Sequence, residues 1–206
     1  MKTLESYAIP VSALAAAITH ARNKDIRYYL NGVYLDFPKG RIVATDGHRL
    51  FCGKIERADC DPVIIPRDTV IDAVKAAKKV KGVAILLLDV REDPNKATDP
   101  RRLELVTAGV SFRAAELDGR FPEYERIIPL SPSGEVGDYN PNYLVDADKA
   151  LATFDGVTYK GMSCSKVWHN GTAGALITRA GTTAFCCIMP VRVDGDSPNI
   201  AWFTAP

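Results

Sequence analysis

The sequence lacks the features by which many enzymes, metalloproteins and membrane proteins are recognised. No stretch approaches the roughly 18 apolar residues of a membrane-spanning helix, and the start, MKTLESYAIP, has no apolar run of signal-peptide length. The five cysteines are odd in number and include no CxxC pair, which argues against a disulfide framework and a zinc site. We therefore expect a soluble, cytoplasmic protein that needs no metal, no other cofactor and no membrane.

An excess of charge of one sign is also missing. The 26 basic residues nearly balance the 25 acidic ones, so the net charge predicts neither strong nonspecific nucleic-acid binding nor an acidic tail. The chain does have a hydrophobic content of 47% over 206 residues, which is enough to form a substantial core. Any electrostatic function must therefore come from how the charges are arranged.

A repeated unit accounts for most of the chain. Three segments each place a proline after a short apolar or aromatic approach and continue with apolar or small side chains at helical spacing. Proline suits the first turn of a helix, because its fixed φ fits there and its missing N–H would be unpaired anyway. The three predicted helical segments are residues 8–21, 64–77 and 139–151.

After each predicted helix the periodicity changes to that of β-strands. Each copy contains two β-rich runs around a threonine and a glycine-bearing turn, which predicts a hairpin. These stretches are residues 42–55, 103–117 and 175–193. The unit is therefore a strand, a helix and about three strands, and we expect an α+β fold. The predicted organisation is a complete domain at 1–129 with units 7–60 and 61–129, a half domain of one unit at 130–193, and a tail at 194–206.

Several motifs resemble the bacterial replicative sliding clamp, the β subunit of DNA polymerase III. The run DIRYYLNGVYLDFPKGRIVATDGHRL (25–50) is similar to the start of that family's middle domain, and ELDGRFPEYERIIP (116–129) is similar to its end. YNPNYLVDADKAL (139–151) and CIMPVRV (187–193) resemble the second half of the last domain. The resemblance covers most of residues 7–193 and leaves the family's first domain, and the first half of its last domain, without a counterpart.

This resemblance implies a fold and a set of partners. The fold would be a DNA clamp built from three strand-helix-three-strand units, with the helices lining an inner face and antiparallel sheets on the outside. The protein would be a processivity factor without enzymatic activity. Its partners would be double-stranded DNA bound without regard to sequence, a DNA polymerase and other proteins with short linear motifs, and a clamp loader. The alternative is a regulator or decoy that binds clamp-directed peptides or a host clamp without encircling DNA.

The first candidate site is a basic surface for DNA. Lys75, Lys78 and Lys79 are spaced i, i+3 and i+4 and so share one helical face, which suits sequence-independent binding of phosphates. From these residues alone a solvated lysine face is the commoner explanation, and the resemblance favours DNA. The resemblance also implies that two adjacent tyrosines, Tyr28 and Tyr29, contact DNA. On a strand their side chains would point to opposite faces. The alternative is that both simply pack. The predicted DNA-binding residues are His20, Arg22, Lys24, Tyr28, Tyr29, Lys75, Lys78, Lys79, Lys81 and Lys149.

The motif TDGHRL (45–50) brings an acid, a base and an arginine close together. Catalysis by Asp46 and His48 would require a third supporting group and a pocket that excludes water, and the sequence indicates neither. Asp46-Gly47 is instead a strong hairpin-turn dipeptide, since glycine accepts positive φ and aspartate can bond the local backbone. We therefore predict a turn at this motif and no enzyme.

The resemblance implies a second role for this motif, as one wall of a groove that receives short peptides from polymerases and repair proteins. A flexible methionine among apolar residues suits such an adaptable pocket. For Met189-Pro190 taken alone, packing at an edge strand is the alternative. By position, the groove residues are Leu30, Thr45, Gly47, His48, Arg49 and Leu50 on one side, Pro129 at the floor, and Cys187, Ile188, Met189, Pro190, Val191 and Arg192 from the end of the third unit.

The tail contains NIAWF (199–203), an aliphatic residue followed by two adjacent aromatic ones, much as in clamp-binding peptides. One hypothesis is that the tail folds back into a groove, its own or a neighbour's, and competes with partners. The alternative is that Trp202 and Phe203 merely pack on the nearest apolar patch.

An odd number of units restricts how a ring could close. In the family twelve units surround DNA and alternate in orientation. Four chains of three units each would also supply twelve units. Identical head-to-tail contacts would break the alternation, whereas isologous contacts, third unit against third and first against first, preserve it. We therefore predict a dihedral tetramer, with a dimer that does not close, or a monomer that caps a host clamp, as alternatives.

Overall fold

A computed structural model describes residues 4–77, 82–89, 100–157 and 165–192 of the chain. The tail and the lysines at positions 78, 79 and 81 lie outside these ranges. The helices are α1 (Val11–Ala17), α2 (Arg67–Ala77) and α3 (Pro141–Phe154). The strands are β1 (Leu4–Pro10), β2 (Gly32–Asp36), β3 (Arg41–Thr45), β4 (Arg49–Lys54), β5 (Val63–Pro66), β6 (Val83–Asp89), β7 (Arg102–Thr107), β8 (Val110–Ala115), β9 (Ser165–Trp168), β10 (Ala175–Arg179) and β11 (Ala184–Ile188).

The described elements form an α+β fold with three helices and two antiparallel sheets, which confirms the predicted fold class. The first unit is β1, α1, β2, β3 and β4, and the second is β5, α2, β6, β7 and β8. The third unit is α3, β9, β10 and β11. Within the described residues, an isolated bridge between Asp138 and Val191 stands where a strand before α3 was predicted, so the third copy departs from the repeat.

The first two units exchange their leading strands. The four-stranded sheet has the order β1-β6-β7-β8, so β1 of the first unit pairs with β6 of the second. The seven-stranded sheet has the order β5-β2-β3-β4-β11-β10-β9, so β5 of the second unit pairs with β2 of the first. Neither unit completes a sheet alone, because each sheet needs a strand from the other unit.

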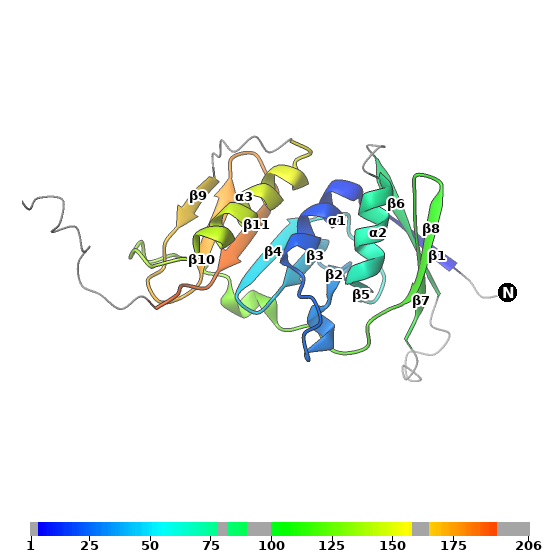
Figure 1. The fold of residues 1–206 in the computed structure, drawn as a ribbon, viewed down its shortest axis with the longest axis horizontal. Coiled ribbons are helices and arrows are strands. Elements are labelled where there is room, and N and C mark those ends of the chain that lie inside the picture. Colours follow the sequence, from blue (N-terminus) through cyan, green and yellow to red (C-terminus); the bar gives the residue numbers. More distant parts are fainter. Residues whose placement is uncertain (1–3, 78–81, 90–99, 158–164, 193–206) are drawn as a thin grey trace, which may run out of the picture.

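The third unit joins the first through β4 and β11, which pair antiparallel from Gly53 and Ala184 to Arg49 and Ile188. The units therefore follow one another in space as second, first and third, as Figure 1 shows. The first unit lies in the middle. The predicted contact of one first unit with another is therefore wrong, because the outer positions belong to the second and third units.

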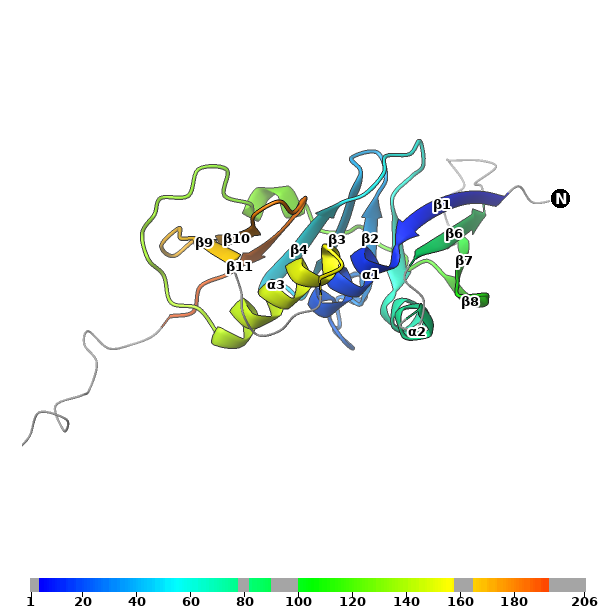
Figure 2. The ribbon, with the colours of Figure 1, turned by 90° about the horizontal axis from the view of Figure 1, so that it is seen from above.

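The three helices lie side by side along one face of the sheets (Figure 2). α1 lies between α2 and α3 and contacts both, and its alanines at 13, 16 and 17 are fully buried. Such small side chains allow close approach of neighbouring helices. Leu14, Val70 and Leu151, one from each helix, join the same core as strand residues such as Phe51. Ile18 and Val74, four residues after Leu14 and Val70, are partly buried against the same core, as the helical spacing of apolar residues predicts.

The opposite face of the seven-stranded sheet is covered by the segment 116–129. Phe121 stacks on Tyr34 of β2, with ring centroids 4.4 Å apart and an interplanar angle of 4°. Together with Tyr124, these rings belong to a second apolar cluster that includes Val43 and Leu50. The central strands are thus packed on both faces, which fixes the position of β4 and its turn. Among the described helices none is long and apolar enough to span a membrane.

Candidate functional site

The TDGHRL motif forms the turn between β3 and β4, as predicted. The Asp46 carboxylate accepts hydrogen bonds from the backbone N–H groups of His48 (2.9 Å) and Arg49 (3.0 Å). The Thr45 hydroxyl donates to the Arg49 carbonyl (2.7 Å) and accepts from the Gly47 N–H (3.1 Å). Gly47 has a φ of 91°, a conformation that glycine adopts without strain. The side chains of Thr45 and Asp46 therefore stabilise the turn itself.

Arg49 points into the molecule. Its Nε lies 2.9 Å from the Asp46 carboxylate, and its Nη1 lies 2.5 Å from the carboxylate of Asp146 on α3. The guanidinium also lies 4.7 Å from the ring centroid of Tyr143, and the side chain is only 14% exposed. Burial opposes its charge, but the hydrogen bonds with Asp146 and Asp46 outweigh this and raise the pKa of Arg49. Arg49 thus links the first unit to the third through its charged group.

His20 lies beside this network and is fully buried. Its Nδ1 is 2.8 Å from the Thr19 hydroxyl, and its ring lies 6.0 Å from that of Phe51. Burial, together with the charge of Arg49, lowers the pKa of His20 to about 3, so the imidazole is neutral at pH 7. A residue with no exposed surface cannot contact DNA, and the prediction for His20 is wrong.

The two predicted walls of the groove lie next to each other. In the pairing of β4 with β11, Leu50 is opposite Cys187 and Arg49 is opposite Ile188. Just beyond β11, the N–H of Met189 donates to the carbonyl of His48 at 2.8 Å. The sheet therefore brings together residues that are more than 130 positions apart in the chain.

The predicted groove residues divide by exposure. Leu30, Thr45, Leu50, Cys187 and Ile188 are buried, so the prediction that they line an open groove is wrong. They belong to strands or to the core and can only support the surface from beneath. The accessible members of the set are Gly47, His48, Val191 and Arg192, which are exposed, and Arg49, Pro129, Met189 and Pro190, which are partly buried.

Sequence reasoning missed two apolar residues at this surface. Ile127 is 41% exposed and Leu130 is 93% exposed, on either side of Pro129. The thiol of Cys187 lies 3.4 Å from the Ile127 carbonyl, so this segment runs beside the end of β11. The signal in the sequence was an apolar run around a proline, which is equally typical of a buried strand.

Four of the predicted DNA contacts beyond His20 lie between α1 and β2, namely Arg22, Lys24, Tyr28 and Tyr29. Lys24 is exposed with a φ of 57°. Arg22 and Arg27 both pair with Asp25, at 3.2 and 3.0 Å, and the Arg27 guanidinium holds the pKa of that carboxyl well below its usual range. The loop is thus an ordered basic surface around one carboxylate.

The adjacent tyrosines lie in a 3-10 helix, Tyr28–Leu30, and not on a strand. Their rings meet edge to face, with centroids 5.9 Å apart. Tyr28 is 51% exposed, whereas Tyr29 packs against the second apolar cluster. Only the first of the two is therefore well placed to contact a ligand. Lys75 on α2 and Lys149 on α3 are exposed, and Lys78, Lys79 and Lys81 lie outside the described residues.

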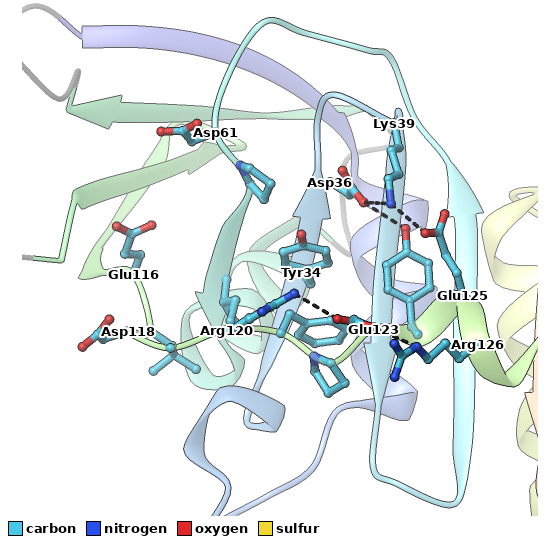
Figure 3. Close-up of a pocket in the computed structure, with 17 residues that line it drawn as sticks. Tyr34, Asp36, Lys39, Asp61, Glu116, Asp118, Arg120, Glu123, Glu125 and Arg126 are labelled. Atoms are coloured by element: carbon cyan, nitrogen blue, oxygen red, sulfur yellow. Dashed lines mark hydrogen bonds and ion pairs between the residues drawn. The ribbon is translucent and has the colours of Figure 1, made fainter. Parts of the chain in front are cut away.

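A cavity of about 890 Å³ lies between the outer face of β2 and β5 and the segment 116–126 (Figure 3). Its charged side chains are largely engaged in internal pairs, such as Glu123 with Arg120 at 3.0 Å and Glu125 with Lys39 at 2.8 Å. Asp36 accepts a hydrogen bond from the Tyr124 hydroxyl at 2.9 Å. The part of the chain described contains no cluster of three or more His, Cys, Asp or Glu residues suited to a metal ion. The contacts of Lys39 and Asp36 with Glu125 and Tyr124 hold segment 116–129 on the sheet.

Comparisons with known proteins agree with this fold. β sliding clamps are 31% identical to the chain over 112 residues in Pseudomonas putida and 35% identical over 117 residues in Vibrio cholerae. These alignments cover 52% and 54% of this chain but only 28% and 29% of the relatives, so the chain matches less than a third of their length.

Solved clamp structures match the fold over a longer part of the chain. The Caulobacter crescentus pol III β structure has a TM-score of 0.71 at 17% identity and covers 92% of this chain and 66% of its own. A DNA polymerase sliding clamp from Pseudomonas aeruginosa has a TM-score of 0.66 at 19% identity and covers 91% and 66%.

The family model for the DNA polymerase III beta subunit, central domain, matches residues 9–123. Since this is more than half of the chain, the protein belongs to the family of β sliding clamps, the β subunits of DNA polymerase III, which are not enzymes.

Proposed function

We propose that the protein is a DNA sliding clamp, in which several copies form a ring around duplex DNA with the helices toward the DNA. A groove on each chain would tether a DNA polymerase or another DNA-acting protein through a short linear motif. The observation that carries the proposal is the junction of β4 with β11, at which Met189 of the third unit bonds to His48 of the first. The protein would act in the cytoplasm and be placed on DNA by a clamp loader.

The proposed groove is formed by the accessible residues at this junction. Met189 has a flexible, polarisable side chain that can adapt to different apolar peptides, and exposed Ile127 and Leu130 extend the apolar surface. The buried Leu50 and Ile188 would keep the floor rigid. The remaining proposed contacts are Gly47, His48, Pro129, Pro190, Val191 and Arg192.

The proposed DNA contacts are the accessible members of the basic and aromatic set. Arg22, Lys24 and Tyr28 belong to the loop after α1, and Lys75 and Lys149 to the helices. Lys78, Lys79 and Lys81 continue the charge of α2 along the sequence and remain part of the proposal. Such contacts neutralise phosphates without reading bases, so the affinity would fall steeply with salt while the protein stayed free to slide.

Ring closure would still use four chains of three units, but the units that meet between neighbouring chains differ from those predicted from the sequence. Because the second and third units are outermost, the isologous contacts would be second against second and third against third. Both kinds of contact preserve the alternation of units around the ring.

One observation favours the second candidate, a protein that binds clamp-directed peptides without encircling DNA. Within their described bounds the three helices carry three basic residues, at 67, 75 and 149, against four acidic ones, at 68, 72, 146 and 148. A DNA-facing layer is expected to be more basic than this. The three lysines at 78, 79 and 81, which follow α2 in the sequence, are not included in this count.

Retention on DNA separates the two candidates. The protein is placed on circular and on linear duplex DNA of the same sequence and washed at high salt. A clamp remains on the circle and leaves the linear molecule over its ends, since its hold is topological. A protein that only binds peptides is washed equally from both, while it still binds a clamp-directed peptide in solution.

A further inference from the structure

We infer that β8 (Val110–Ala115) joins two copies of this chain, by antiparallel pairing with the β8 of a second copy about a two-fold axis. The inference rests on the proposed function, which requires contacts between chains, and it identifies the strand that makes one of them. The juxtaposition that carries it is the pairing already present between the last strands of the other two units.

The last strands of two of the three units pair with each other. β4 ends the first unit and β11 ends the third, and these two pair antiparallel over five residue pairs. β8 ends the second unit and is the terminal strand of its sheet, with β7 on its inner side. β4 and β11 have neighbours on both sides, so among the described strands that end a unit it is β8 whose outer edge is free to pair with a second copy.

The outer edge of β8 carries few of the devices that prevent strand pairing. It is six residues long, contains no proline, and pairs with β7 in unbroken register from Val110 to Ala115. An edge of this kind presents unpaired N–H and C=O groups to any strand that can align with it. Figure 2 shows β8 and β1 at opposite margins of the four-stranded sheet. The charged residue of β8, Arg113, pairs with Glu104 on β7 at 3.2 Å.

The two-fold axis restricts the register of the pair. Residues directly opposite one another in an antiparallel pair share a face of the sheet, so the axis must pass at a residue and not between two residues. Phe112 and Ala114 pack against the core on one face, and Ser111 and Arg113 lie on the other. An axis at Arg113 would place two arginines opposite each other, which is unfavourable.

An axis at Phe112 gives a compatible set of neighbours. Phe112 then meets its own copy, and Val110, which is 45% exposed, meets Ala114, so the apolar face continues across the junction. Arg113 meets Ser111, whose hydroxyl is bonded to the Glu104 carboxylate. Aromatic pairs across strands are stabilising, and no like charges are opposite each other. We therefore assign the register with Phe112 at the axis.

Substitutions on the exposed face test both the pairing and its register. Ser111→Arg places an arginine opposite Arg113 twice in the assembly, whereas within one chain it can pair with Glu104 and should not disturb folding. We expect sedimentation equilibrium to show association that is roughly tenfold weaker than in the unsubstituted chain. The double variant Ser111→Arg with Arg113→Ser places the arginine opposite a serine again and restores the association.

The outcomes separate this inference from the proposed function. Association that is unchanged in the Ser111→Arg variant, or that the double variant fails to restore, overturns the β8 contact and leaves the clamp function standing. A chain that stays monomeric at tens of micromolar overturns it as well. Loss and recovery of association as expected, in a protein that shows no preference for circular DNA, supports the β8 contact and counts against the clamp.

Discussion

The side chain of Arg49 joins two parts of the fold that are distant in the sequence. Its ion pairs with Asp46 and Asp146 connect the β3–β4 turn to α3, which belongs to another unit. The turn itself could be predicted, because Asp-Gly between two strands has a local physical meaning. The direction of Arg49 could not be predicted, since Asp146 lies 97 residues away and no local pattern encodes that distance.

Asp46 should be one of the most sensitive positions in the protein. Replacing it with alanine removes two hydrogen bonds to the turn and leaves Arg49 partly buried with one carboxylate fewer. We expect Asp46→Ala to lower the free energy of unfolding by about 2 to 3 kcal/mol in urea denaturation. Asp118→Ala, at an exposed aspartate, is the matched control and should change stability by less than about 0.5 kcal/mol. Equal effects of the two substitutions would show that the turn does not depend on this carboxylate.

His20 should make stability depend on pH. Its pKa is lowered to about 3 in the fold, so the unfolded chain, with a pKa near 6.5, binds the proton more readily. The contribution of the neutral His20 imidazole to the free energy of unfolding is therefore full above pH 6.5 and is lost as the pH falls toward 3. Linkage gives a loss of about 2 kcal/mol between pH 7 and pH 5.

The measurement is the free energy of unfolding at several pH values for the unsubstituted chain and for His20→Gln, which cannot titrate. The variant should have a flatter profile between pH 7 and pH 5, whatever its absolute stability. Parallel profiles would mean that His20 is accessible to protons in the folded state.

At the scale of the elements, the helices and hairpins were largely predictable and their partners were not. Proline at the start of each helix and the change from helical to strand periodicity are local signals, and they located α1, α2 and α3. The pairing of β4 with β11 joins segments more than 130 residues apart, so only the resemblance to a family suggested it. The strand expected at the two tyrosines is a 3-10 helix, because the chain turns there before entering β2.

The junction of the first and third units depends on a glycine. A Cβ added to Gly53 of β4 would lie 2.6 Å from the ring of Phe154, the last residue of α3. We expect Gly53→Ala to displace this ring and to lower the free energy of unfolding by about 1 to 3 kcal/mol. Hydrogen exchange should show the largest increase in the amides of α3.

Gly82→Ala is the matched control, since nothing lies within 4 Å of a Cβ at that position. It should leave both the stability and the exchange of α3 close to those of the unsubstituted chain. If Gly53→Ala behaves in the same way, α3 does not depend on close packing against β4.

At the scale of the whole molecule, the order of the units in space determines how copies can meet. The first unit lies between the other two, and the terminal strands of the two described sheets include β8 of the second unit and β9 of the third, beside β1 and β5. Sequence reasoning placed the first unit at an end, because chain order was taken for spatial order. The pairing of β4 with β11 removes that equivalence, because it places the third unit beside the first and not beside the second.

The central claim is that a ring of these chains holds DNA by enclosing it. The most direct test loads the protein onto a closed DNA circle at high salt and then cuts the circle once with a restriction enzyme. Enclosure of the DNA should give stable retention before the cut and rapid release after it, and blocked DNA ends should prevent the release. Release at the same rate before and after the cut would show that binding does not depend on topology and that the chains do not form a closed ring around DNA.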